Sequence, residues 1–560
     1  MRTLAPALAL AALALTPPVA RADAPPPGSS WTQATIGESD GTKLHADVLR
    51  PANLPVNAKT PVILSIGPYF NHSGQTGPAG PIEDTPYTPA GEAGPSARFF
   101  DFINGAKLME KGYTWVQVDL RGFGGSSGCL DWGGPGEQAD VKAAVEWAAR
   151  QPWSTGKVGM YGKSYDGVTG LIGIAQQPQG LSAVVSQEPV YDLYRYLYSN
   201  RVRFENSLAT PLLYDAIAAT PGTAGDTLAY NLQSLNSPVC LATNWLNQQT
   251  LDHDASYWKD RDLIAKTKGK ATPLFLTQGF IENNTKPDGT WDLYNGLTGP
   301  KRAWFGMWDH VRGNDTDASG RLLMGRQGWF EETGRFFDRY LKGETVADDP
   351  ANLVQTSDGT WRSEQQWPPA DSTALDTELN VGDYTDDGQN NGTGEGAGTG
   401  IWTISNRLTQ DAHLSGVPKL SVDVAKAPGN ANLVADVYDI DSGRNATLIS
   451  RGATLLSGNE LTSFDLYGDD WKIPAGHRVG VLITSSNAEW WFHVPTLGTV
   501  TVRDAHVELP FLKCTRTANE PGASSVKLDS YKAEAPFNIP TETVESATRP
   551  DFTVPSTISC

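Results

Sequence analysis

Ser164 is the residue of this sequence whose surroundings best suit it to chemistry. Residues 162–167 (Gly-Lys-Ser-Tyr-Asp-Gly) have the G-x-S-x-G spacing of a nucleophile elbow, with one residue inserted before the last glycine. An apolar run, 158–161, precedes the motif, and a run of apolar and small residues, 168–175, follows it. Strand, sharp turn and helix are the context that the motif requires, so we expect Ser164 to be a nucleophile. A P-loop is excluded because position 157, where its first glycine would stand, is Lys.

A serine nucleophile needs a base, and in this fold the chain order is serine, acid, histidine. Two of the eight histidines precede Ser164 and four lie in the β-rich C-terminal region. Of the two that remain, His253 falls in a segment expected to form a cap. His310 follows a short loop after a buried strand, where the base belongs, and we predict that it is the base.

The acid should follow the preceding strand, and three carboxylates are candidates. Glu282 comes soon after the apolar strand 273–277, whereas Asp288 and Asp292 lie further along the same loop. Position relative to the strand favours Glu282, with Asp292 as the main alternative.

An acyl-transfer intermediate also needs donors for its oxyanion. The backbone N–H of Tyr165, next after the nucleophile, is one candidate. The phenolic O–H of Tyr69, which follows the strand 61–66, is the other, unless this tyrosine only packs in its Pro-Tyr turn.

The elements that must position these residues alternate between strand and helix. Apolar runs at 61–66, 113–119, 181–185, 273–277 and 302–305 predict strands, and 99–111, 140–150 and 334–341 predict helices. This pattern indicates an α/β fold with a mostly parallel sheet, and reactive groups then gather beyond the carboxyl ends of its strands. We assign the catalytic domain to 30–190 and 269–349, and a helical cap insertion to 191–268. Short alternating strands predict an all-β sandwich or jelly roll over 350–560.

Composition and charge limit the classes of partner that the protein can have. The chain has 560 residues, 39% hydrophobic and 19% charged, with a formal net charge of −19. So acidic a chain argues against nucleic acid and anionic membranes as partners. Residues 1–24 resemble a signal peptide, with Arg2, an apolar run over 4–15 and small-x-small cleavage sites, although an uncleaved anchor is the alternative. We therefore expect an exported protein, extracellular or periplasmic.

Four cysteines suit an exported protein, and four allow three pairings. Cys514 and Cys560 both fall in the C-terminal region, which favours a bridge between them and leaves Cys129 with Cys240. No C-x-x-C pair is present, so no zinc or redox site is expected, and no cofactor. The pair Asp439 and Asp441 could bind calcium, but two loop acids are more often solvated.

At this point the motifs resemble a known family. The segments 162–167, Pro68-Tyr69, 119–128, 306–310 and 361–369 are similar to those of X-prolyl dipeptidyl-peptidases, bacterial cocaine esterase and α-amino-acid ester hydrolases. The resemblance implies an α/β-hydrolase fold with a helical cap and a C-terminal jelly roll. It also implies that Tyr69 donates to the oxyanion and that the acid stands at Glu282, where the family usually has Asp.

These expectations describe a serine hydrolase that cleaves esters or amides, of dipeptidyl-peptidase or carboxylesterase type. A dipeptidyl-peptidase needs an anchor for the free amine of its substrate, and spacing alone does not choose among four acids: Asp166, Glu188, Asp192 and Glu205. The alternative function is a non-catalytic protein that binds carbohydrate or cell wall through the β-sandwich, suggested by the aromatic run 490–492. Core packing of those aromatics would argue against it. Oligomeric state is not predicted.

Overall fold

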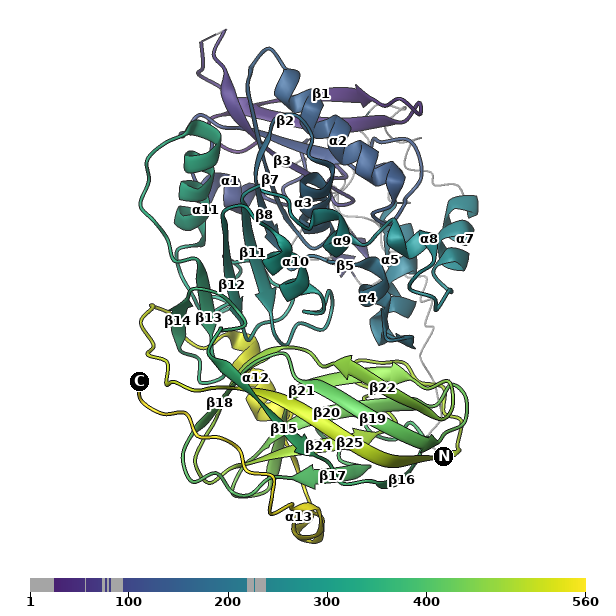
Figure 1. Ribbon diagram of the computed structural model, residues 1–560. Helices are drawn as coiled ribbons and strands as arrows, with labels where there is room; N and C mark the ends of the chain where they lie inside the picture. Colours follow the sequence, from purple (N-terminus) through teal and green to yellow (C-terminus); the bar gives the residue numbers. More distant parts are fainter. Residues whose placement is uncertain are drawn as a thin grey trace.

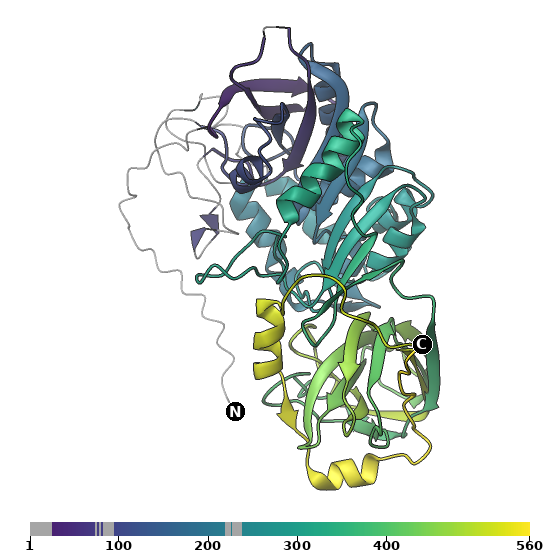
Figure 2. The same ribbon diagram turned by 90° about the vertical axis from the view of Figure 1, so that its left-hand side faces the viewer.

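The computed structural model describes residues 25–55, 57–72, 76–77, 80–81, 94–218, 226 and 238–560. The predicted signal peptide, 1–24, lies outside them. Figure 1 shows an upper part in which helices cover a central sheet and a lower part made mainly of strands. Figure 2, turned by 90°, shows the two C-terminal helices, α12 (Val526–Glu534) and α13 (Thr541–Ala547), on the lower part.

The upper sheet has ten strands, of which the central ones are parallel. In spatial order they are β1 (Ser29–Gly37), β2 (Lys43–Pro51), β6 (Thr114–Asp119), β3 (Thr60–Gly67), β7 (Ser154–Lys163), β8 (Leu181–Gln187), β11 (Leu274–Gly279), β12 (Lys301–Gly306), β13 (Asn352–Gln355) and β14 (Trp361–Glu364). Every pairing from β6 to β13 is parallel, and the outer pairs are antiparallel. The α/β class is confirmed.

Helices bury both faces of this sheet, which is why β3 is apolar without interruption. Val62 and Leu64 face the core that includes α2 (Pro135–Arg150) and α3 (Tyr165–Gln176). Ile63 faces the opposite core, with α1 (Phe100–Gly105) and α11 (Trp329–Phe337).

All three predicted helices have other bounds in the structure. The helix expected over 140–150 begins earlier, at Pro135. The helix expected over 99–111 is only α1, Phe100–Gly105, because Lys107 and Gly112 take positive φ angles of 55° and 75° and turn the chain. The helix expected over 334–341 begins earlier, at Trp329, and continues beyond Phe337 as one turn of π-helix, Asp338–Lys342.

The residues described between β8 and β11 form short helices and two short strands, β9 (Tyr198–Ser199) and β10 (Val202–Arg203). The α-helices described there are α4 (Leu193–Leu197), α5 (Thr210–Ala218), α7 (Pro238–Asn247), α8 (Ser256–Lys259) and α9 (Leu263–Thr267). Cys240 in α7 lies at disulfide distance from Cys129 in the loop after β6, with Cα atoms 6.0 Å apart. This bond ties the helical segment to the main sheet.

The lower part contains two antiparallel sheets packed face to face. One has seven strands: β15 (Ser372–Glu378), β16 (Gly382–Thr385), β18 (Ala412–Gly416), β19 (Lys419–Lys426), β22 (Glu460–Asp465), β23 (Asp469–Ile473) and β25 (Thr499–Leu512). The other has five: β17 (Ile401–Ile404), β20 (Asn432–Ile440), β21 (Asn445–Leu455), β24 (Arg478–Thr484) and β26 (Phe537–Asn538). The predicted start of this region, residue 350, precedes two strands, β13 and β14, that complete the upper sheet.

The C-terminal aromatics pack at the contact between the two parts. Trp490 and Trp491 are 3% and 2% exposed and lie against Phe204 of the segment between β8 and β11, whereas Phe492 is 45% exposed. Cys514, just after β25, lies at disulfide distance from Cys560, with Cα atoms 5.4 Å apart. Among the residues described, no helix is both long and apolar enough to cross a bilayer.

Candidate active site

Ser164 occupies the turn between β7 and α3. Its φ and ψ angles are 63° and −126°, a strained conformation for a residue with a side chain. Its N–H donates to the carbonyl of Gln187 at 2.9 Å, and its carbonyl accepts from the N–H of Val168. The flanking glycines are needed, since a Cβ atom at Gly162 would lie 2.3 Å from the carbonyl oxygen of Asp166. This is the backbone of a nucleophile elbow.

His310 and Glu282 lie beyond the ends of the next strands. Glu282 follows β11 and His310 follows β12, and Glu282 Oε2 is 2.9 Å from Nδ1 of His310. Burial would raise the pKa of Glu282, but His310 and the hydrogen bonds from Thr285 and Asn284 outweigh burial and lower it. The carboxylate is therefore ionised and orients the imidazole ring.

The other candidate acids have different partners. Asp288 and Asp292 pair with Arg195, at 3.0 and 3.2 Å, and Asp292 lies on α10 (Thr290–Gly296) with its side chain 60% exposed. Asp309 accepts from the N–H of His310 and pairs with Lys527 at 3.2 Å. The carboxylate on the imidazole of His310 is thus that of Glu282.

Gln187 and Thr285 connect Ser164 to this pair. The backbone carbonyl of Gln187 accepts from the N–H of Ser164. Its side-chain Oε1 accepts from the N–H of Gly313, in the loop that carries His310, at 3.0 Å. Thr285 donates its hydroxyl hydrogen to Glu282 and lines the same cavity as Ser164. Ser164, Glu282 and His310 therefore all follow strands that end at the carboxyl edge of the sheet, where β8 separates β7 from β11.

Glu188 is hydrogen-bonded to residues at the ends of two strands at this edge. Its carboxylate accepts from Thr277 Oγ1 at 3.1 Å, from the N–H of Gly279 at 3.0 Å and from Trp308 Nε1 at 2.8 Å. Burial and the charge of Glu282 raise the pKa of Glu188 to about 8. From the sequence, Glu188 was a candidate only as an amine anchor. In the structure its hydrogen bonds join the end of β11 to the residues that follow β12.

The three other amine-anchor candidates also point elsewhere. Asp166 pairs with Arg98 at 2.6 Å, and Asp192 caps α4 and contacts His253 at 3.0 Å. Glu205 is exposed at the surface. None of the four acids lines the cavity beside Ser164.

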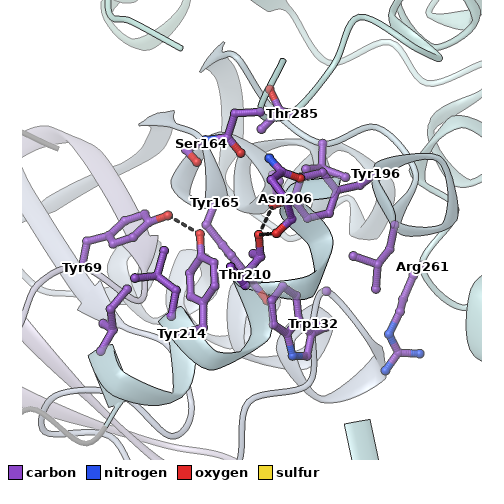
Figure 3. Close-up of a pocket in the computed structure, with 18 of the residues that line it drawn as sticks. Tyr69, Trp132, Ser164, Tyr165, Tyr196, Asn206, Thr210, Tyr214, Arg261 and Thr285 are labelled. Carbon is purple, nitrogen blue, oxygen red and sulfur yellow. Dashed lines mark hydrogen bonds between the residues drawn. The ribbon is translucent and has the colours of Figure 1, made fainter. Parts of the chain in front are cut away.

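The two tyrosines predicted as oxyanion donors lie beside Ser164. Tyr69 and Tyr165 both line the cavity of Ser164 (Figure 3), and the Tyr69 hydroxyl is hydrogen-bonded to that of Tyr214. The guanidinium of Arg98 lies over the Tyr69 ring at 3.9 Å and holds it in place. Tyr165 is the first residue of α3, so its N–H has no acceptor within the helix.

The cavity beside Ser164 has a volume of about 550 Å³ and mostly apolar walls. Aromatic residues form much of the wall: Tyr69, Trp132, Tyr165, Tyr196 and Tyr214. Aliphatic side chains from α3, α4 and α5 complete it. Arg261 contributes, but its guanidinium points away from Ser164 in Figure 3 and pairs with Asp131 at 2.7 Å. No carboxylate among the described residues lines this cavity.

Sequence reasoning missed Tyr214 and Trp132 in the cavity wall, and Arg98 over the ring of Tyr69. Tyr214 comes from α5, and only the folding of the helical segment over the sheet brings it to Ser164. No motif in the sequence marks these positions.

The strand order, the elbow and the buried glutamate–histidine pair define the class of the protein as an α/β hydrolase. Two family models match the chain: X-Pro dipeptidyl-peptidase (S15 family) over residues 40–312, and the X-Pro dipeptidyl-peptidase C-terminal non-catalytic domain over 344–525. The chain belongs to the X-Pro dipeptidyl-peptidase (S15) family of hydrolases.

Relatives agree with this family, and a solved structure agrees with the fold. A putative Xaa-Pro dipeptidyl-peptidase of Bacillus cereus is 23% identical, covering 85% of this chain and 88% of the relative. The cocaine esterase of a Rhodococcus strain is 26% identical over 48% of this chain and 52% of its own length. A CocE/NonD family hydrolase structure from Staphylococcus aureus has a TM-score of 0.66 at 18% identity, covering 86% of this chain and 94% of that one. The structural similarity supports the fold.

Proposed function

We propose that the protein is an exported serine hydrolase in which Ser164 attacks the carbonyl carbon of an ester or amide. The observation that carries the proposal is the buried Glu282–His310 contact at 2.9 Å, beside the strained turn that bears Ser164. A histidine whose Nδ1 is held by an ionised carboxylate presents Nε2 as the base.

The reaction then follows from the positions of these groups. Oγ of Ser164 bonds to the carbonyl carbon while His310 takes the proton of the hydroxyl. The oxyanion that forms is stabilised by the phenolic O–H of Tyr69 and the N–H of Tyr165. His310 returns the proton to the leaving alcohol or amine, and water then hydrolyses the acyl-enzyme by the same steps.

The cavity favours an uncharged, apolar acyl group over a peptide with a free amino terminus. A protonated amine in a mostly apolar cavity needs a carboxylate, and none among the described residues lines it. We therefore propose a carboxylesterase first and an X-prolyl dipeptidyl-peptidase second. The family and the Bacillus cereus relative support the second candidate.

A comparison of two chromogenic substrates separates the candidates. We expect p-nitrophenyl butyrate to be hydrolysed with a kcat/KM well above that for Gly-Pro-p-nitroanilide, and both activities to disappear in Ser164→Ala. A higher value for the anilide would reverse the order of the two candidates. Turnover of neither substrate would contradict the proposal as a whole.

Export is the second part of the proposal. The N-terminal 24 residues have the composition of a signal peptide, and two cysteine pairs at disulfide distance suit an oxidising compartment. Mass spectrometry of protein from the culture medium and the periplasm should find a chain that begins after Ala22 or Ala24. An intact N-terminus on cell-associated protein would contradict export.

A further inference from the structure

A second cluster of reactive side chains lies outside the cavity of Ser164. His45, Asp47 and His72 are 8%, 1% and 1% exposed, and one ligand atom from each lies within 4.8 Å of the others. In the part of the chain that the structure describes, no other group of three histidines, cysteines or acids converges in this way.

The sheet itself brings these residues together. His45 and Asp47 are two residues apart in β2, so their side chains share one face. Gln33 of β1 pairs directly with Asp47 across the strands and joins them on that face. His72 comes from the segment after β3, three positions beyond Tyr69.

Both imidazoles are oriented by a carboxylate. Nδ1 of His45 is 3.0 Å from Asp119, and Nδ1 of His72 is 2.7 Å from Asp226. The Nε2 atoms of both rings face Asp47, at 3.9 and 3.0 Å. A carboxylate on the far nitrogen is the arrangement that orients histidines bound to metals.

The spacing suits a tetrahedral ion. Bonds of 2.0–2.2 Å place neighbouring ligand atoms roughly 3.3 Å apart, and the two distances to Asp47 lie on either side of that value. Gln33 Oε1, 3.0 Å from His45 Nε2, can supply a fourth oxygen ligand. Trp31 and Gln117 donate to Asp47 at 2.7 and 3.3 Å and fix its carboxylate.

Charge also calls for a cation here. Three buried carboxylates, those of Asp47, Asp119 and Asp226, surround two histidines. Positive charge comes either from protons on the imidazoles or from a bound divalent ion.

We infer that His45, His72 and Asp47 form a structural zinc site, with Gln33 or a water molecule as the fourth ligand. The ion would join the segment that carries Tyr69 to β2 at the edge of the sheet. It does not line the cavity of Ser164, so its role is to hold this segment rather than to take part in the reaction. This departs from the sequence analysis, which expected no metal.

The first test is the zinc content of the whole protein. After expression in zinc-supplemented medium and dialysis against EDTA, elemental analysis should find about one zinc per wild-type chain. His72→Ala should lose it. His477→Ala should keep it, because His477 pairs with the single carboxylate of Asp439 at 2.8 Å. Zinc-free wild type, or zinc retained equally by His72→Ala, would overturn the inference in favour of a protonated histidine pair or a different site.

A second measurement tests the site even if His72→Ala does not fold. Wild-type protein expressed with cobalt in place of zinc should show the intense visible absorption of tetrahedral cobalt, which zinc abolishes. Asp226→Ala removes the carboxylate that faces His72 Nδ1 and should weaken zinc affinity by about 10- to 100-fold with an unchanged circular dichroism spectrum. A wild type that shows no cobalt band would contradict the site without any reference to hydrolysis.

Discussion

At the scale of single residues, Glu282 differs from Asp288 and Asp292 in what surrounds its carboxylate. Glu282 is fully buried against His310, whereas both aspartates form ion pairs with the partly exposed side chain of Arg195. Sequence order was enough to favour Glu282, because it stands nearest to the end of its strand. It did not eliminate Asp292, since the pairing with Arg195 joins two segments far apart in the chain.

The first prediction concerns the acid. Glu282→Gln should lower kcat/KM for a p-nitrophenyl ester by about 10²- to 10⁴-fold, because the amide no longer holds the imidazole in the required tautomer. Glu282→Asp, which keeps a carboxylate on a side chain one methylene shorter, should retain more activity. Asp292→Asn is the control and should stay within about twofold of wild type. A large loss in Asp292→Asn with little loss in Glu282→Gln would move the acid to position 292.

The second prediction concerns the oxyanion. Tyr69→Phe removes one donor and should lower kcat by about 10²- to 10³-fold with little change in KM. Tyr196→Phe, also in the cavity wall but bonded to Thr210 at 3.2 Å, is the matched control and should keep kcat. Equal kcat values for both variants and wild type would contradict the oxyanion role and show that Tyr69 only packs.

At the scale of elements, the periodic strands of the sheet were predictable and the surroundings of the cavity were not. Buried parallel strands such as β3 and β6 stand out as apolar runs, so the order of strands and elbow follows from the sequence. Helix ends were less predictable: α1 ends at Gly105, and the chain turns at Lys107, whose positive φ no turn-forming residue type announces. The histidine cluster was missed because His72 joins the β2 residues only through the tertiary fold.

The third prediction concerns the disulfide that joins α7 to the main sheet. Replacing both Cys129 and Cys240 by Ser opens a link spanning 111 positions and should lower the free energy of unfolding by about 2–5 kcal/mol. It should also raise KM, because this link holds the helical segment whose α5 lines the cavity. Replacing Cys514 and Cys560, which join the tail to the end of β25, should leave KM unchanged. Denaturation curves and steady-state kinetics check both pairs.

At the scale of the whole molecule, the C-terminal sheets contact the helical segment that covers the cavity. Backbone hydrogen bonds join Glu205 to Trp490 at 2.8 Å and Phe492 to Arg203 at 2.9 Å. Sequence analysis placed the aromatics 490–492 either in a glycan-binding surface or in packing, and burial of Trp490 and Trp491 favours packing. The domain boundaries stay predictions, since β13 and β14 extend the upper sheet past residue 350.

The fourth prediction follows from that contact. Trp490→Ala should destabilise the protein by about 3–5 kcal/mol, because it leaves a cavity between Phe204 and Tyr467. Phe492→Ala, whose ring is 45% exposed, should change stability by less than about 1 kcal/mol. Chemical denaturation followed by tryptophan fluorescence and circular dichroism measures both, and similar values for the two variants would argue against a packed contact.

The most direct test of the account is covalent labelling of Ser164 by a fluorophosphonate, read by intact mass and peptide mapping. We predict one adduct per chain, on Ser164, absent in Ser164→Ala and slower by at least about 10²-fold in His310→Ala. Labelling of another residue, or an equal rate in His310→Ala, would contradict the claim that His310 activates Ser164.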